Sequence, residues 1–563
     1  MGDTGLTGSG NPRVHRLRSR GESRGRAWRN ATVFTGCIAL GVGLLASSVS
    51  TSSGREANAA AQPSSSLTVN WALSGQAAAT SAQSGNDPAN AIDGDAATSW
   101  CPDSWQGSIT VDLGQARGLS GIGITMAPAS PSASASVDLA TGPGQWQKVP
   151  AARLLGLDPG DPMYIGLPAG ASARYARLTV TSGTGAPVCI GEFRLFGADP
   201  AAAKMQLGAD LSFTPQEEAA GAHFTDRGVA SDPVTIMKNN GGNYVRLRLW
   251  VKPPPGYSDL ASDLAMARRI KAAGMRLYLD IMYSDFWADP QHQDIPAAWQ
   301  GQDLAQLTQT VQSYTQQVIS AFATQGTPVD MVSIGNEIRN GILWPIGQVD
   351  PSTGTGYDAL ATLLKAGVTG ARAVNPPGHR LDVMMHYDQG ANNQLSQAFF
   401  QNLVSRAVPF DVIGLSYYPF FHGTVSAMRA NVNALANQFH KRLVIAETQY
   451  PWTLANGDST GDFVWQPSQV VSGYPASAGG QLSFVSDELS ILAQAPDGLG
   501  VGLFYWSPEW IPGVGWEPGA GTPNDNLTLF DFQGRALPSI GIFRSPVAVC
   551  ESYNPYNVAC EVG

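Results

Sequence analysis

The sequence predicts a (β/α)₈ barrel, which is an α/β fold, preceded by a separate all-β sandwich. From about residue 205 to residue 505, eight short apolar stretches alternate with longer amphipathic stretches, the pattern of a parallel α/β fold. From about residue 68 to residue 197, short alternating runs are separated by Gly, Pro and Ser clusters, which is typical of a sandwich. Two of the eight apolar stretches end in a glutamate, so the barrel also carries candidate catalytic groups.

Length and charge narrow the class of protein. The chain has 563 residues and a formal charge of −10, and 14 % of its residues are charged. This length indicates more than one domain, and the composition is that of a globular chain. A negative surface repels polyanions, so nucleic acid and acidic pectin backbones are disfavoured as partners, whereas a neutral polysaccharide is compatible.

Residues 1–61 read as a secretory leader. An Arg-rich stretch over residues 13–29 precedes an apolar run over residues 31–49, and small-residue sites such as Ala57-Asn-Ala59 follow. The apolar run is short for a membrane span. We therefore expect a secreted monomer with no membrane contact after leader removal; the alternative is an uncleaved anchor.

Four of the five cysteines lie after the leader. An even number of cysteines in a secreted chain indicates disulfides, and four cysteines allow three pairings. We expect Cys101 to pair with Cys189 and Cys550 with Cys560, because each pair lies within one predicted domain and the second would hold a C-terminal tail in place.

The sandwich is predicted over residues 66–198, and four of its segments carry a family resemblance. They are Asn90-Ala-Ile-Asp-Gly-Asp95, Thr98-Ser-Trp100, Ile109-Thr-Val-Asp-Leu-Gly114 and Glu192-Phe-Arg-Leu-Phe-Gly197. Together they resemble the discoidin or coagulation-factor type C fold, a jelly roll that includes carbohydrate-binding module family 32. The resemblance implies a sugar-binding module.

That resemblance also implies a structural calcium near one turn. In similar modules, carbonyls and carboxylates around the Asp-Gly-Asp turn hold the ion, which makes Asp93 and Asp95 candidates. The alternative is that both are ordinary turn aspartates. Trp105 could stack on a sugar or belong to the core.

The barrel is predicted over residues 204–547, with residues 548–563 as a short tail. Eight βα units in about 340 residues fit a (β/α)₈ barrel, whose active site is built from the C-terminal ends of its strands. The candidate strands span residues 205–211, 244–251, 276–281, 331–335, 381–385, 412–415, 443–446 and 500–505.

Glu337 and Glu447 stand at the ends of the fourth and seventh candidate strands. Glu337 follows Asn336 and precedes Arg339, and aromatic residues follow both glutamates. A carboxylate at the end of a buried strand is costly unless it is used, although Glu337 alone could cap a helix or pair with Arg339. Two glutamates on strand ends of one barrel are what a retaining glycosidase needs, with their carboxyl groups about 5 Å apart.

Other strand ends carry candidate sugar contacts. Alternation places Arg246 and Arg248 on one face of the second strand, where they could hold a carboxylate or form structural salt bridges. The loop after the third strand contains Asp285 and Trp287, which indicates a sugar-binding rim rather than a metal site. His386, Tyr418 and Trp506 follow the fifth, sixth and eighth strands, and aromatic side chains suit stacking on sugar rings.

The barrel segment closely resembles glycoside hydrolase family 53, the endo-β-1,4-galactanases. The motifs are Gly208-Ala-Asp-Leu-Ser212, Val245-Arg-Leu-Arg-Leu-Trp-Val251, Tyr283-Ser-Asp-Phe-Trp-Ala-Asp-Pro290, Ser333-Ile-Gly-Asn-Glu-Ile-Arg339, Ser416-Tyr-Tyr-Pro419, Glu447-Thr448 and Phe504-Tyr-Trp506. The resemblance implies Glu337 as acid/base and Glu447 as nucleophile. It further implies Asn336 as partner of the sugar 2-hydroxyl, Arg246 and Tyr418 as groups that orient Glu447, and Trp506 as the floor under the sugar.

Two features qualify the resemblance. Many members place a Glu directly after the eighth-strand Trp, where this chain has Ser507, with Glu509 two residues later. Bacterial relatives hold a calcium in the loop after the seventh strand, and Asp458 and Asp462 are candidates for it; the alternative is a solvated loop. No other cofactor is expected.

The sequence thus predicts a secreted retaining endo-hydrolase of β-1,4-galactan, the galactose side chains of pectin, with an N-terminal sugar-binding module. The alternatives are a barrel glycosidase for another neutral β-glycan and a carbohydrate-binding protein whose barrel is inactive. Loss of either glutamate would favour the last, and both are present.

Overall fold

The computed structural model describes residues 67–152, 155–253, 257–374, 376–515, 520–552 and 560–561. The predicted leader, residues 1–61, lies outside these ranges. The predicted pairing of Cys550 with Cys560 concerns side chains that are also outside the described set. Within the described ranges, none of the helices combines the length and the apolar character that crossing a bilayer requires.

Eight parallel strands close into a barrel, as the sequence predicts. Every predicted stretch becomes a barrel strand, and no end moves by more than two residues. Buried parallel strands read as continuous apolar runs, which is why they are visible in the sequence. In barrel order they are β11 (Gln206–Asp210), β14 (Tyr244–Leu249), β15 (Arg276–Ile281), β16 (Met331–Ile334), β19 (Asp382–Tyr387), β20 (Val412–Tyr417), β21 (Arg442–Thr448) and β22 (Gly500–Tyr505).

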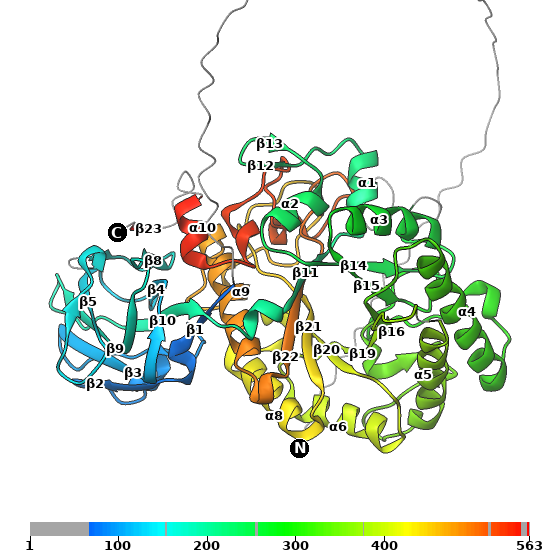
Figure 1. Cartoon of the computed structure of the whole chain (residues 1–563), viewed down its shortest axis with the longest axis horizontal. Helices are drawn as coiled ribbons and strands as arrows, with labels where there is room; N and C mark the ends of the chain where they lie inside the picture. The colour runs from blue at the N-terminus through cyan, green and yellow to red at the C-terminus, as the bar shows by residue number, and fades with distance from the viewer. Residues whose placement is uncertain are drawn as a thin grey trace, which may run out of the picture. The chain divides into compact units, whose positions relative to one another are not determined.

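Helices surround the barrel on the outside (Figure 1). They are α1 (Thr214–Ala219), α2 (Pro233–Asn239), α3 (Leu260–Ala272), α4 (Leu304–Thr324), α5 (Tyr357–Arg372), α6 (Asn393–Ser405), α7 (Pro419–His422), α8 (Val425–Phe439), α9 (Ala478–Ala493) and α10 (Pro546–Ser552). The longest, α4, begins with a capping box between Asp303 and Gln306, and it buries Leu307, Val311 and Val318 at helical spacing against the barrel.

The inside of the barrel is a packed core rather than a channel. Side chains from all around the barrel fill it, including Tyr244, Tyr278, Met384 and Phe504. Gly414 leaves room for this layer, because a Cβ there would lie 2.3 Å from the sulfur of Met384. Polar groups are therefore concentrated at the C-terminal ends of the strands.

The N-terminal segment forms a sandwich of two sheets. One contains β1 (Thr68–Asn70), β10 (Ile190–Ala198), β4 (Gly121–Met126), β8 (Met163–Gly166) and β23 (Cys560–Glu561). The other contains β2 (Gln76–Ala79), β3 (Gln106–Gly118), β9 (Ser172–Ser182), β5 (Ala133–Ala140) and β6 (Gln147–Lys148), with β7 (Leu155–Leu157) paired to β5. The predicted disulfide between Cys101 and Cys189 is present. Trp100 is fully buried and Trp105 is half exposed.

A buried ion pair joins the sandwich to the barrel. Arg194 on β10 donates from Nε and Nη2 to the two carboxylate oxygens of Asp487 on α9, at 2.7 and 2.5 Å. Both side chains are completely buried. Because an unpaired charge at such a position is very costly, each residue depends on the other domain being in contact.

Hydrogen bonds around a sandwich turn extend this contact. The Asp95 carboxylate accepts from the backbone N–H and the hydroxyl of Ser426, at 3.1 and 2.7 Å. Arg429 donates to the carbonyl oxygens of Asp93 and Leu73 at 2.8 and 2.9 Å. One apolar cluster also runs through both domains. The two domains therefore form a single packed unit across this face.

Candidate active site

Glu337 lies directly after β16 in a strained backbone conformation. Its φ and ψ are 48° and 51°, and the preceding Gly335 also has a positive φ of 87°. A left-handed conformation is uncommon for a residue with a side chain and costs on the order of 1 kcal/mol or more. The turn aims the Glu337 carboxyl group into a cleft at the C-terminal end of the barrel.

Glu447 lies on β21 and faces the same cleft. Arg246 contacts its Oε1 at 2.7 Å, and the Tyr418 hydroxyl donates to Oε2 at 2.8 Å. Burial raises the pKa of Glu447, whereas the guanidinium and the hydroxyl lower it by favouring the carboxylate. The two donors thus place and stabilise an ionised Glu447.

The surroundings of Glu337 favour the protonated form. Burial and the charge of Glu447 raise the pKa of Glu337 well above its ordinary value, and a hydrogen bond from Ser416 opposes them. In contrast to Glu447, Glu337 makes no ion pair with an arginine in the part of the chain that the structure describes. Environments that separate two carboxyl groups in this way assign one as acid and the other as anion.

The two carboxyl groups are close together. A carboxyl oxygen of Glu337, a carboxyl oxygen of Glu447 and a ring nitrogen of His386 all lie within 4.8 Å of one another. Among the described residues, these three side chains are the only set of acidic and histidine groups that lie close enough together to bind a metal ion. The guanidinium at 2.7 Å from Glu447 opposes a cation there by charge repulsion. The spacing suits a direct attack by one carboxylate.

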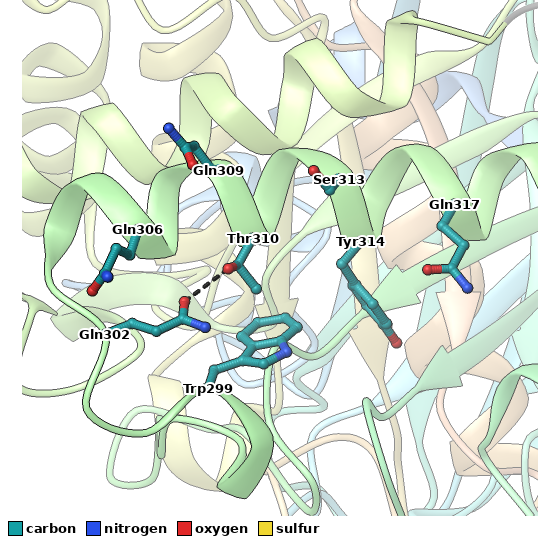
Figure 2. Close-up of a pocket in the computed structure, with 8 residues that line it drawn as sticks. All are labelled: Trp299, Gln302, Gln306, Gln309, Thr310, Ser313, Tyr314 and Gln317. Carbon is teal, nitrogen blue, oxygen red and sulfur yellow. Dashed lines mark hydrogen bonds between the residues drawn. The ribbon is translucent and has the colours of Figure 1, made fainter.

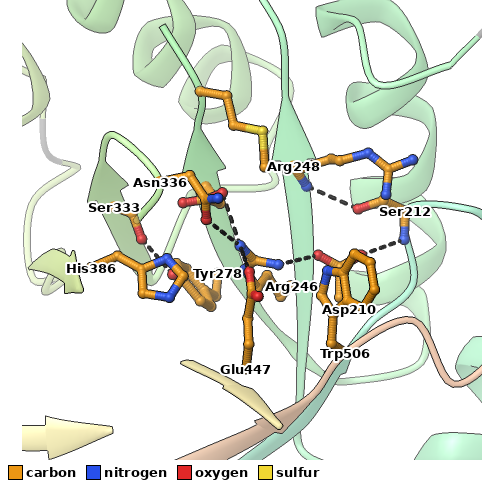
Figure 3. A network of polar contacts seen from close by, with 12 residues as sticks. Asp210, Ser212, Arg246, Arg248, Tyr278, Ser333, Asn336, His386, Glu447 and Trp506 are labelled. Atoms are coloured by element: carbon orange, nitrogen blue, oxygen red, sulfur yellow. Dashed lines mark hydrogen bonds and ion pairs between the residues drawn. The ribbon is translucent and has the colours of Figure 1, made fainter. Parts of the chain in front are cut away.

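Arg246 is the centre of the polar network beneath the cleft (Figure 3). It is fully buried and contacts Asp210, Asp280 and Glu447 at 2.7, 2.9 and 2.7 Å. It also donates to Oδ1 of Asn336 at 2.9 Å. Burial raises the pKa of Asp280 to about 7, against the opposing effect of Arg246. The network fixes the guanidinium against the nucleophile and orients the Asn336 amide.

His386 acts on Glu337 through Ser416. The Nε2 atom of His386 lies 2.9 Å from the Ser416 hydroxyl, which donates to Oε1 of Glu337 at 2.6 Å. Burial and the charge of Arg246 lower the pKa of His386 well below its ordinary value, so the ring is neutral and donates from Nε2. His386 is therefore an orienting residue behind the cleft. Beyond its place in the Ser-Tyr-Tyr-Pro motif, no sequence signal indicated the role of Ser416.

The cleft has the lining expected for sugar. Its volume is about 750 Å³, within the range of ligand sites. Aromatic side chains of the cleft are Phe286, Trp287, Tyr418, Phe420, Phe421, Phe463 and Trp506. The rings of Trp287 and Trp506 meet edge to face, with centroids 6.2 Å apart. Sugar rings present apolar faces that stack on such side chains.

Two residues differ from their sequence interpretation. Asp285 does not line the cleft; its carboxylate instead accepts from the backbone N–H of Ala297 at 2.9 Å and so holds the loop that carries Trp287. Its role as a substrate contact stays a prediction, and the contact that the structure gives it is this backbone hydrogen bond. Arg248 forms no salt bridge in the described part of the chain; its guanidinium lies over the rings of Phe213 and Trp287, at 4.0 and 4.4 Å. Cation–π contacts replace the ion pair.

Glu509 also lies outside the cleft. Its carboxyl group accepts from the Thr214 hydroxyl at 3.1 Å, and burial raises its pKa to about 8. It therefore does not take the place of the glutamate that Ser507 lacks.

The two calcium candidates differ from each other. In the sandwich, Asp93 accepts from the Asp95 N–H and the Thr98 hydroxyl, and Asp95 accepts from Ala97 and Ser426. These oxygens are already used, which favours the ordinary turn aspartates over a calcium site. The calcium interpretation of Asp93 and Asp95 stays a prediction, and these hydrogen bonds support the alternative that both are turn aspartates.

The loop after β21 fits a cation better. The carboxyl groups of Asp462 and Asp525 contact each other. Apart from that contact, neither oxygen of Asp462 nor Oδ1 of Asp525 has a hydrogen-bond partner among the described residues, and all three atoms are buried. Burial raises the pKa of Asp462 to about 7 and that of Asp525 to about 6. Asp458 instead accepts from the backbone N–H groups of Thr460 and Thr522. Hard oxygen donors without partners are ligands that suit calcium, with Asp525 rather than Asp458 as the second carboxylate.

Comparison with known proteins gives the same picture. Residues 206–543 match glycosyl hydrolase family 53, and residues 76–193 match the F5/8 type C domain. An uncharacterized protein encoded in the bgaB 5′ region of Niallia circulans is 38 % identical over 345 residues, 60 % of this chain and 93 % of that protein. Arabinogalactan endo-beta-1,4-galactanase A of Aspergillus niger is 34 % identical over 349 residues, 61 % of this chain and 95 % of that protein.

Two solved structures agree with the barrel. The GH53 catalytic domain of Ignisphaera aggregans is 36 % identical with a TM-score of 0.58, and the match covers 62 % of this chain and 97 % of that one. A fungal beta-1,4-galactanase is 32 % identical with a TM-score of 0.53, over 60 % and 99 % of the two chains.

Proposed function

Because the chain belongs to glycosyl hydrolase family 53, we propose that this glycosidase is a retaining endo-β-1,4-galactanase, secreted as a monomer, that acts on the galactan side chains of pectin. The observation that carries the proposal is the pair Glu337 and Glu447. Their oxygens lie within 4.8 Å, and of the two only Glu447 has an arginine partner among the described residues. Retaining enzymes have carboxyl groups about 5–5.5 Å apart, whereas inverting enzymes separate them further to admit a water.

The reaction follows from the surroundings of each glutamate. Glu447, ionised and held by Arg246 and Tyr418, attacks the anomeric carbon. Glu337 gives its proton to the departing glycosidic oxygen as the bond to that oxygen breaks. The now ionised Glu337 then takes a proton from water, which attacks the anomeric carbon and releases Glu447 from the galactosyl ester.

Neighbouring groups serve this sequence of steps. Ser416 fixes one oxygen of Glu337 and leaves the other for the glycosidic bond. Asn336, whose Oδ1 is held by Arg246 and whose Nδ2 donates to the carbonyl of Ala288, is placed to contact the 2-hydroxyl of the sugar. Trp506 and Trp287 form an aromatic floor. An aromatic-lined cleft of about 750 Å³ favours binding of several sugars and hence internal cleavage.

The test is reducing-sugar release from purified β-1,4-galactan beside arabinan, mannan and xylan. We expect galactan alone to be cleaved and oligosaccharides to appear before galactose. Early NMR spectra of the products should show the β-anomer, since two inversions retain configuration. Cleavage of a different glycan would support a related barrel glycosidase, and inactivity on all four would support the binding protein.

We also propose that Asp462 and Asp525 hold a structural calcium. Their buried oxygens, which have no hydrogen-bond partner beyond this pair, support the proposal. Within the described residues, the only three acidic or histidine side chains whose ligand atoms lie within 4.8 Å of one another are those of the catalytic group, so these two aspartates cannot bind the ion alone. Carbonyl groups or water would complete the coordination, as is usual for this ion.

Calcium should therefore raise the melting temperature of the chelator-treated protein. At a calcium concentration a hundred times the Kd, the stabilisation is about 2.7 kcal/mol. Because Asp462 must lose its proton and its pKa is about 7, the shift should be larger at pH 8 than at pH 6. Asp462→Asn should abolish it, whereas Asp458→Asn should retain it. An equal shift in Asp462→Asn would contradict this site.

A further inference from the structure

The outer face of α4 is built differently from its neighbours. Its 21 residues include no Asp, Glu, Lys or Arg, whereas α3 and α5 carry both acidic and basic residues. Apart from Ala305, the exposed positions of α4 are occupied by neutral polar side chains, among them Gln309, Ser313 and Gln317. Exposed helix faces ordinarily carry charged residues. The exposed face of α4 is thus polar but uncharged, a composition that it shares with α6.

A hollow of about 500 Å³ lies along this face (Figure 2). Gln309, Ser313 and Gln317 follow one another along the helix beside it, and Trp299 and Gln302 border it from the preceding loop. The side chains of Gln309, Ser313 and Gln317 make no hydrogen bond to the protein within the described residues. Their amide and hydroxyl groups are thus available to a ligand.

The floor of the hollow is fixed before any ligand binds. The Thr310 hydroxyl donates to Oε1 of Gln302 at 2.7 Å, as Figure 2 shows. The Trp299 and Tyr314 rings meet edge to face, with centroids 5.3 Å apart. Only 7 % of Trp299 is exposed, so this ring gives the floor its shape while the amides supply the contacts. A preformed surface loses little entropy on binding.

The hollow is close to the cleft along the chain. Asp289 and Asp294 line the cleft, and Trp299 comes five residues after Asp294. Five residues span at most about 18 Å. The hydrogen bond from Ala297 to Asp285 ties this connecting segment to the loop that carries Trp287. A polymer that leaves the cleft on this side therefore needs only a short further segment to reach α4.

We propose that the hollow on α4 is a second binding site for a neutral polysaccharide, occupied by a more distant part of the chain that is cut in the cleft. A side-chain amide both donates and accepts hydrogen bonds, which matches neighbouring hydroxyl groups of a sugar. Removing water from an amide also costs less free energy than removing it from a charged group. The proposal rests on the function proposed above for its ligand, β-1,4-galactan. The site holds long chains to the enzyme and has no part in the chemical step.

The test compares long galactan with galactotetraose, which is too short to occupy both sites. The test variant is Gln309→Ala/Ser313→Ala/Gln317→Ala; its positions are exposed and alanine favours helix, so the fold is kept. We expect KM for long galactan to rise about threefold to tenfold, the effect of losing one net hydrogen bond. The kcat on galactan and both constants for the tetrasaccharide should stay unchanged.

A matched control lies on the same helix outside the hollow: Gln312→Ala/Gln316→Ala should match wild type on both substrates. Binding is measured separately in the Glu337→Gln background, by retardation in native gels that contain galactan, mannan or xylan. Weaker retardation of the triple variant than of the control supports the site. Equal retardation and equal KM overturn it. Wild type that fails to cleave galactan would instead reject the proposed function, and the three gels would still decide whether the hollow binds a neutral glycan.

Discussion

Glu447→Gln is expected to lower kcat on galactan by at least about a thousandfold, because no other group can form the bond to the anomeric carbon. Glu337→Gln should lower it by about 10²–10⁴, the range for loss of a general acid. Both variants should keep the fold, since glutamine preserves the volume and one acceptor oxygen, and Arg246 keeps its ion pairs with Asp210 and Asp280. The measurement is steady-state hydrolysis with circular dichroism as the check on folding.

The two roles separate when the leaving group changes. An aryl β-galactobioside with a good leaving group needs little acid assistance, so Glu337→Gln should recover much of its first step on it, whereas Glu447→Gln should not. Azide should restore activity to Glu337→Gln and give a β-galactosyl azide. Azide is an anion, so it can attack the galactosyl ester in place of water without the help of a general base. Rescue of Glu447→Gln with an α-azide would support its role as nucleophile. The opposite anomers would reverse the assignments.

Glu509→Gln is the matched control. Glu509 is a buried glutamate of the same barrel, but it lies outside the cleft. Its pKa of about 8 keeps it protonated at neutral pH, so glutamine replaces a neutral group of similar shape. Activity near that of wild type is expected, and a loss as large as that of Glu337→Gln would show that buried carboxyl groups in general support the fold.

The sequence was sufficient for the barrel and for the place of the two glutamates at its strand ends, for a physical reason. A strand that is buried on both faces is a short apolar run, and a carboxyl group at its end is conspicuous because burial penalises it. Glu337 and Glu447 both stand out in this way. Asp210 and Asp280 stand in or next to such runs too, but only the fold shows that they converge on Arg246.

Long-range contacts were outside the reach of the sequence. Nothing local to Asp95 indicates that its carboxylate contacts Ser426, which is 331 residues away. Asp285 illustrates a second limit: an acidic residue beside a cleft aromatic reads as a substrate contact, while its actual partner is a backbone N–H twelve residues away. Side-chain direction in a loop depends on the path of the whole loop.

The pair Arg194 and Asp487 gives the second large prediction. Asp487→Ala leaves the Arg194 guanidinium buried with Thr125 as its remaining side-chain hydrogen-bond partner among the described residues. Breaking a buried pair on one side typically costs about 3–5 kcal/mol. We therefore expect a clear fall in the melting temperature measured by calorimetry. Because the pair joins two domains, the single transition of wild type should split into two, one for the sandwich and one for the barrel.

Removing both charges should be less harmful than removing one. Arg194→Met with Asp487→Leu replaces the pair with apolar side chains of similar volume, and such replacements are often neutral or stabilising. The control is Glu218→Ala, which breaks the partly exposed pair with Arg269 and should cost about 0–1 kcal/mol. If Asp487→Ala unfolded in one transition at the temperature of Glu218→Ala, the two domains would be held together by their apolar contact alone. The other outcome is two transitions for Asp487→Ala and one transition for the double variant. It would establish that the two domains separate because of the uncompensated charge and not because of lost packing.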